Sequence, residues 1–126
     1  MNSEILKKRT KSFALRCINL CNAIPSKMPG IYISNQLMRS SLSTAANYRA
    51  ACLSRSKNEF NSKISIVLEE ADESLFWIEI IEEQKLVAPN LLVSIKKEAH
   101  ELTRIFLASK ATSSKKKKNV KQNNQK

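Results

Sequence analysis

The strongest constraint on the fold is the scarcity of residues that make turns. The 126-residue chain contains one glycine and three prolines, whereas an all-β or α/β domain of this length needs many more turns. Valine, isoleucine and threonine do not alternate with polar residues, so the main signal for a strand is missing. The length suits one domain that buries a core without cross-links. We therefore predict an all-α domain made of a few long helices.

Apolar residues recur at helical spacing in four segments. The first covers about residues 3–23, and the loop IPSKMPG separates it from the second, about residues 31–53. The third follows a capping-box pattern, Ser56 with Glu59, and reaches about residue 84. The fourth starts near Pro89 and fades near residue 112. Short loops between four amphipathic helices predict an antiparallel up-down-up-down four-helix bundle.

We place the bundle in residues 1–111. Residues 112–126 are polar and lysine-rich, with Val120 as the one large apolar side chain. Such a segment buries too little apolar surface to order itself, so we expect a disordered tail.

The net charge of +11 is unevenly distributed along the chain. Residues 1–57 carry ten Lys and Arg against Glu4 alone, a net +9, whereas residues 58–111 carry a net −4 and residues 112–126 a net +6. A basic half beside an acidic half favours self-association, and the basic part suits a polyanion such as RNA or DNA. Solubility alone is the simpler explanation of the same charge.

A cluster of cations can neutralise the phosphates of a nucleic acid. The affinity of a protein that binds in this way falls steeply as salt is raised. Few aromatic residues accompany the cations, so binding should follow the nucleic-acid backbone with little sequence preference. The candidate nucleic-acid-binding residues are Lys7, Lys8, Arg9, Lys11, Arg16, Arg49, Arg55, Lys115, Lys116, Lys117 and Lys118.

No catalytic or metal-binding pattern is evident. Cys17, Cys21, Cys52 and His100 form a four-ligand set on paper, but the cysteines lie on apolar helix faces, where a thiol behaves as a small hydrophobe. Di-metal bundles need Glu-x-x-His pairs on two helices, and this chain has one histidine. There is no glycine-rich phosphate loop. We predict a protein without cofactor, metal or catalytic residues, and keep a metal-dependent enzyme as a remote alternative.

The compartment follows from the cysteines and the N-terminus. An odd number of cysteines, and an N-terminal segment without the apolar stretch of a signal peptide, favour a reducing cytoplasm. No apolar run approaches the ~20 residues of a membrane span. We expect a cytoplasmic protein without a membrane partner.

The third segment is apolar on nearly all sides at LFWIEII, residues 75–81. One bundle core needs less apolar surface than this, and an exposed apolar patch usually marks an interface. The expected oligomer interface consists of Phe76, Trp77, Ile80 and Ile81.

Two runs of sequence resemble a known family. The order NQLMRSSLSTAANYRAACLSRSKNEF followed by EEADESLFW resembles the small four-helix-bundle proteins first described as encoded inside intervening sequences of bacterial 23S rRNA genes. The matching positions are Gln36, Arg39, Ser40, Ser43, Ala46, Asn47, Ser56, Glu59, Phe60, Glu70, Ala71, Glu73 and Trp77. The resemblance covers about residues 5–110. One position departs from the pattern, because Ala50 stands where many members carry a glutamate.

This resemblance implies a bundle that assembles into a ring, usually a homopentamer. The chain is also similar to the accessory protein of diversity-generating retroelements, which implies contacts with nucleic acid and a reverse transcriptase. Neither resemblance implies any catalytic residue.

The resemblance also suggests a role for the small residues of the second helix, which would let a neighbouring helix approach closely. Asn47 would then be a buried polar group that bonds a neighbouring helix and fixes its register. Arg39 would pair with a buried Glu70 or Glu73, and these four residues form the predicted structural polar core.

Two functions of different class remain open at this point. The first is a non-enzymatic oligomer that binds nucleic acid or a ribonucleoprotein through its basic helices and tail. The second is a structural or scaffold protein whose partner is another protein, with the positive charge serving assembly.

Overall fold

The computed structural model describes the backbone of residues 1–124 and the side chains of residues 1–112. Within that part of the chain the elements are α1 (Ser3–Asn22), α2 (Gly30–Ala51), α3 (Lys57–Glu83), a 3-10 turn η1 (Pro89–Leu91) and α4 (Val93–Asn124). No strand occurs among these residues. The predicted all-α four-helix bundle is confirmed.

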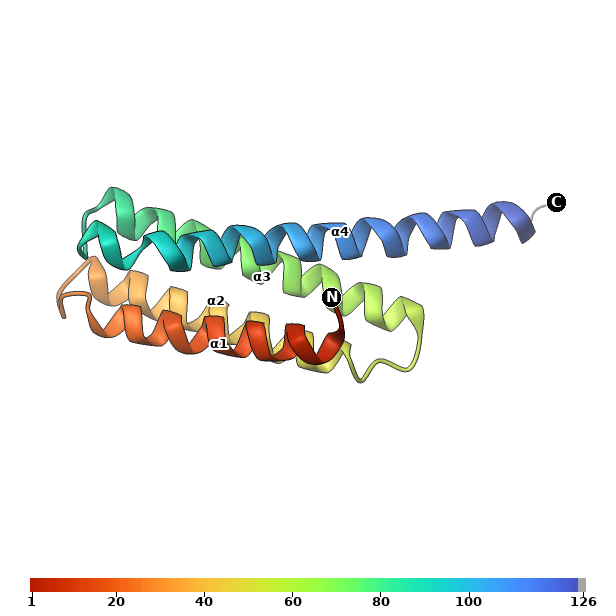
Figure 1. Ribbon diagram of the computed structural model, residues 1–126, viewed down its shortest axis with the longest axis horizontal. Coiled ribbons are helices and arrows are strands. Elements are labelled where there is room, and N and C mark those ends of the chain that lie inside the picture. The colour runs from red at the N-terminus through yellow and green to blue at the C-terminus, as the bar shows by residue number, and fades with distance from the viewer. Residues whose placement is uncertain (125–126) are drawn as a thin grey trace.

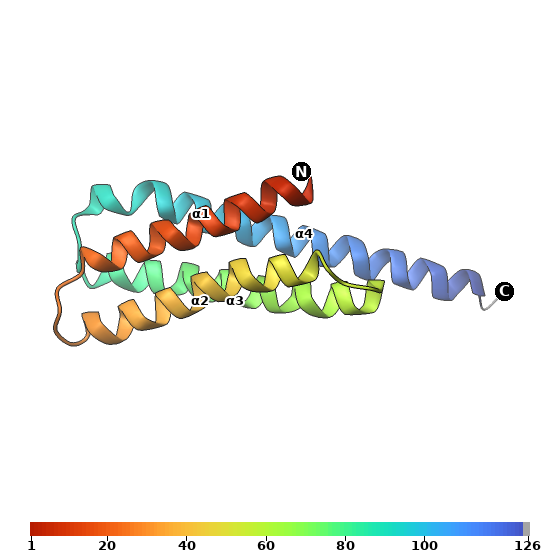
Figure 2. The ribbon, with the colours of Figure 1, turned by 90° about the horizontal axis from the view of Figure 1, so that it is seen from below.

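The chain reverses direction between consecutive helices, as Figures 1 and 2 show. α1 packs against α2 and α4, and α3 packs against the same two helices from the other side. Contact is most extensive between α2 and α3 and least extensive between α1 and α4. This difference between the two interfaces decides where charged side chains can lie.

Local chemistry explains where the helices begin and end. Asn2 caps α1 by accepting a bond from the Ile5 backbone N–H at 2.9 Å. The predicted capping box at α3 is present, since the Ser56 hydroxyl accepts from the Glu59 N–H at 3.1 Å. At the start of α2 only glycine fits, because a Cβ on Gly30 would lie 2.8 Å from the backbone oxygen of Pro25.

The third helix ends without a glycine. Lys85 takes the left-handed conformation (φ 53°) and its N–H bonds to the carbonyl of Glu82 at 3.1 Å. The next N–H, of Leu86, bonds to the carbonyl of Ile81 at 3.1 Å, which completes a Schellman motif. This cap turns the chain toward η1 and α4.

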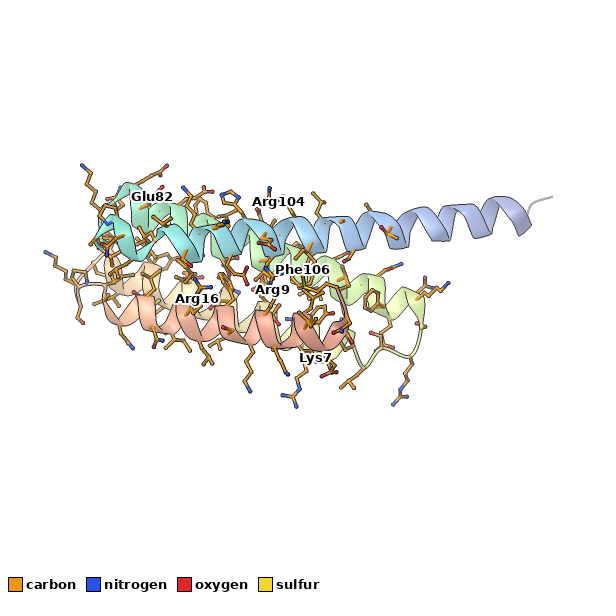
Figure 3. The ribbon with its side chains drawn as sticks, in the orientation of Figure 1. Lys7, Arg9, Arg16, Glu82, Arg104 and Phe106 are labelled. Atoms are coloured by element: carbon orange, nitrogen blue, oxygen red, sulfur yellow. The ribbon has the colours of Figure 1, made fainter. Side chains whose placement is uncertain are left out.

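The core lies along the bundle axis and comes from all four helices. Its largest fully buried members include Phe13 of α1, Leu37 of α2, Ile78 of α3 and Phe106 of α4. The ring of Phe106 packs on that of Tyr48, with centroids 5.4 Å apart. Figure 3 shows Phe106 between α4 and the other helices.

The fourth helix continues further than the sequence predicts. Its backbone is helical through Asn124, whereas we expected the helix to fade near residue 112. No proline or glycine follows Pro89, and lysine, glutamine and serine are tolerated in helices, so nothing in the chain forces an end. The side chains of residues 113–126 lie outside the described residues, and the boundary between bundle and tail stays a prediction.

Candidate nucleic-acid interface

Basic residues gather at the end of the bundle where α1 begins, α2 ends and α3 begins. The backbone of α4 leaves the bundle at this same end (Figures 1 and 2). Of the predicted phosphate-binding residues, Lys8 and Lys11 of α1, Arg49 of α2 and Arg55 of the following loop are exposed. We call these four residues, together with Lys7, the basic end.

The pKa of Lys7 shows that the two helices bring their charges together. It is raised, first because the ammonium donates to Glu4 at 2.7 Å. Burial and the nearby positive charge of Arg49 oppose that rise. The charges of Lys7 of α1 and Arg49 of α2 therefore influence each other across the two helices.

Two of the predicted phosphate ligands bind helix α4 instead. The guanidinium of Arg9 donates from Nε to Glu98 at 3.1 Å and forms a second ion pair with Glu101 at 3.1 Å. Arg16 donates to the Ser94 hydroxyl at 2.7 Å. Figure 3 shows both arginines between α1 and α4. The charge of Arg9 is already paired across this interface, so its assignment to nucleic acid stays a prediction that the structure does not support.

The four lysines Lys115–Lys118 lie outside the residues whose side chains are described. Their place on nucleic acid stays a prediction. Only the helical backbone of this part of α4 is described.

A second basic surface was missed from the sequence. Lys97, His100 and Arg104 are exposed on α4 and line a shallow hollow of about 510 Å³ with Val93, Lys96 and Glu82. Arg104 lies on the outer side of α4, away from α1 (Figure 3). Spacings of three and four residues place all three on one face, and that periodicity was the available signal.

The predicted pairing of Arg39 with the acids of α3 is present. Its guanidinium donates to Glu70 at 2.9 Å and also to Glu73, whose carboxylate accepts from the Trp77 indole at 3.0 Å. The Arg39 side chain is 47% exposed, so the network lies on the surface. The expectation that Arg39 belongs to a buried polar core is therefore wrong.

Asn47 does not bond a neighbouring helix, which corrects the second expectation for the polar core. Its amide donates to the backbone oxygen of Ser43 and to the Ser43 hydroxyl, both at 2.9 Å and both within α2. The polar contact between α2 and α3 is made by two serines, because the Ser74 hydroxyl donates to the Ser40 hydroxyl at 2.9 Å. Both serines are completely buried. Serine is small enough to sit where the two helices are closest.

The expected oligomer interface divides into exposed and buried residues. Phe76 is 48% exposed, and Trp77 and Ile80 are half-buried. Ile81 is completely buried in the bundle core and has no surface for a partner, so its assignment is wrong. Tyr32 of α2 meets Trp77 edge-on, with ring centroids 5.9 Å apart, and thereby adds an aromatic residue that the sequence did not indicate.

The cysteines lie in the bundle as apolar residues. Burial raises the pKa of Cys17 to about 12 and also raises the pKa of Cys21. The thiol of Cys21 donates to the backbone oxygen of Ser34 at 3.5 Å. Among the residues with described side chains, no group of three or more His, Cys, Asp or Glu is placed to hold a metal ion. Within the same part of the chain, no helix combines the length and apolar character needed to cross a bilayer.

Comparison with known proteins settles the family. The family described as 23S rRNA-intervening sequence protein matches residues 2–108. The chain belongs to this family. A crystal structure of a protein of unknown function from the S23 ribosomal protein family of Bacteroides thetaiotaomicron is similar over 82% of this chain and 96% of that chain, with 27% identity and a TM-score of 0.76. No curated protein matches.

The resemblance drawn from the second and third helices is thus confirmed. Membership of the 23S rRNA-intervening sequence protein family and the structural likeness agree on a helical bundle. The similar structure is itself of unknown function, so activity has to be argued from the residues.

Proposed function

We propose that this member of the 23S rRNA-intervening sequence protein family binds the phosphate backbone of RNA or DNA, without catalysis, through its basic end. One observation carries the proposal. Lys8, Arg49 and Arg55 are exposed toward one end of the bundle and Lys11 is exposed near the middle of α1, and none of them forms an ion pair with an acid among the described side chains.

Three other cations of the bundle are compensated by acids. Arg9, Arg39 and Lys96 each pair with acids of α3 or α4. The four cations Lys8, Lys11, Arg49 and Arg55, in contrast, form no ion pair among the described side chains, so their charge is available to an approaching anion. Exposed Lys and Arg contact phosphates and release counterions, which makes the affinity depend steeply on salt. The lysine-rich segment follows on α4, which leaves the bundle at the same end (Figure 1).

The test is fluorescence anisotropy of labelled RNA and DNA with the full chain at several salt concentrations. We expect the logarithm of the binding constant to fall linearly with the logarithm of salt. The double variant Lys8→Gln/Arg49→Gln should reduce the magnitude of that slope by about 2, one unit for each phosphate contact. The matched control is Lys27→Gln/Lys85→Gln, which removes two exposed charges from the loops at the other end and should leave the slope unchanged.

A full-length variant with Lys115, Lys116, Lys117 and Lys118 all changed to Gln separates the tail from the folded surface. If this variant loses all binding while Lys8→Gln/Arg49→Gln binds normally, the basic end is not the site.

A second function, association with protein, is favoured by the aromatic surface of α2 and α3. Tyr32 is 51% exposed and Phe76 48% exposed, and both touch Trp77. We propose that this surface joins copies of the chain into a homo-oligomer, for which a pentamer is the expectation from the family. Light scattering of Phe76→Ser should show a smaller particle than the parent, whereas Leu15→Ser, at an exposed position of α1, should not change the size.

A further inference from the structure

A cavity of about 430 Å³ opens at the basic end, between the start of α1, the end of α2, the start of α3 and α4. Its volume falls in the ~300–1000 Å³ range of small-molecule sites. The apolar part of its wall comes from Met1, Leu6, Ala51, Phe60 and Ile64. The polar part consists of hydroxyls and one thiol, from Ser3, Tyr48, Cys52, Ser54 and Ser109.

One of these polar groups lacks a partner. The Ser54 hydroxyl oxygen is buried and makes no hydrogen bond. A buried hydroxyl without a partner is unfavourable, so a ligand that bonds it would recover part of that cost. Tyr48, which is 5% exposed, brings a second hydroxyl to the same wall. The cavity therefore offers hydrogen bonds as well as apolar contact.

No charged side chain lines the cavity, yet cations surround its mouth. Lys7 directly follows the wall residue Leu6 in the chain, and Arg55 directly follows the wall residue Ser54. Glu4 is paired with Lys7, and Glu59 accepts a bond from the Arg55 backbone N–H. The result is a neutral, partly polar interior beside a positively charged rim.

We propose that this cavity binds the base of an unpaired nucleotide while its phosphate lies on Arg55 at the rim. A nucleobase is neutral, has apolar faces and carries several donors and acceptors, which matches the wall. An acyl chain would leave the Ser54 hydroxyl unpaired. The inference rests on the proposed function and deepens it, because it predicts a preference for single strands, whose bases are free to leave the stack.

The first test uses the reactivity of Cys52 in the native full chain. Cys17 and Cys21 are buried and their pKa values are raised, so iodoacetamide at pH 8 should label Cys52 first. AMP or UMP should slow the labelling of Cys52 at least threefold, measured by peptide mass spectrometry. Ribose 5-phosphate and inorganic phosphate, which lack the base, should not. Equal labelling rates with all four ligands would overturn the inference.

The second test asks whether a free nucleotide or a strand is the ligand. A single-stranded oligonucleotide should protect Cys52, and a blunt duplex of the same sequence should not. Protection by nucleotides alone would limit the site to free nucleotides and overturn the predicted preference for single strands.

The third test fills the cavity from α4. Ser109→Leu places a larger side chain in the wall, and Ala108→Leu, at the exposed neighbouring position outside the wall, is the matched control. The parent and Ala108→Leu should bind a single strand at least threefold more tightly than a duplex. Ser109→Leu should bind both equally, with the salt dependence of duplex binding retained.

These outcomes separate the inference from the proposed function. If nucleic acid binds with a salt dependence but does not protect Cys52, the proposal for the basic end is supported and the proposal that the cavity binds a base is overturned. If circular dichroism shows that Ser109→Leu does not fold, the labelling of Cys52 in the parent protein still tests whether the cavity binds a base.

Discussion

The two interfaces that α1–α4 and α2–α3 make across the bundle are built in opposite ways. Between α2 and α3, small buried side chains let the helices approach, and Ser40 and Ser74 share a hydrogen bond at the contact. Between α1 and α4 contact is least extensive, and Arg9 and Arg16 reach across to Glu98, Glu101 and Ser94. Side-chain size sets how closely two helices approach. Where helices are held apart, long charged side chains make the connection.

The comparison explains why an arginine count did not identify the nucleic-acid surface. Arg39 forms an ion pair with an acid of α3, and Arg9 forms one with an acid of α4. The arginines that stay unpaired among the described side chains include Arg49 and Arg55, near the end of α2. Position relative to the acids, rather than the number of cations, selects the residues that can meet a phosphate.

The largest expected effect on stability comes from removing a bulky side chain that packs α4 against the other helices. Phe106 is completely buried against Tyr48. Phe106→Ala should lower the free energy of unfolding by ~3–5 kcal/mol, the usual range for deleting a buried phenylalanine side chain. Urea denaturation followed by circular dichroism measures this. Leu107→Ala, at an exposed position one residue on, is the control and should change stability by less than ~0.5 kcal/mol. Equal effects of the two variants would mean that α4 is not packed through Phe106.

A smaller effect is expected from adding bulk between α2 and α3. Ser40→Leu should cost ~1–3 kcal/mol, because the completely buried site has no room for two more heavy atoms. Ser12→Leu, on the exposed face of α1, is the matched control. If Ser40→Leu were as stable as the parent in urea, the helices would not be in the close contact described.

The smallest effect is expected at the charged connection between α1 and α4. The Arg9 side chain is 21% exposed and Glu98 18% exposed, so part of their attraction is screened by solvent. A double-mutant cycle with Arg9→Ala and Glu98→Ala should give a coupling of about 1 kcal/mol at low salt, near the upper end for such pairs. The coupling should shrink as salt is raised. A coupling of zero at low salt would show that α1 and α4 are joined without this pair.

Several parts of the fold were readable from residues alone. Proline and glycine in the loop IPSKMPG separate α1 from α2, and Ser56 with Glu59 caps α3. Pro89 was expected to open the fourth helix, but it opens a 3-10 turn, and α4 starts at Val93. The end of α3 was predicted to within one residue. Its cap uses Lys85 in a left-handed conformation, which is usually taken by glycine and therefore had no signal in the sequence.

The candidate site was readable only in part. Charge at Lys8, Lys11, Arg49 and Arg55 was correctly expected to be exposed. The cavity was missed because its wall joins the neighbouring residues Tyr48, Cys52 and Ser54 to Ser3 and Ser109 from distant parts of the chain, and each alone is an ordinary helix or loop residue. Sequence spacing carries no information about which residues meet across a bundle end.

The sequence by itself determined that this protein is a bundle of helices with a basic first half, because periodicity, caps and charge are local properties of the chain. Only the tertiary structure decided that Arg9 bridges to α4, that Ile81 is core, and that Ser40 rather than Asn47 bonds across α2 and α3. The physical reason is that a side chain's partner depends on which helix lies beside it and at what rotation. Those quantities follow from packing all four helices together.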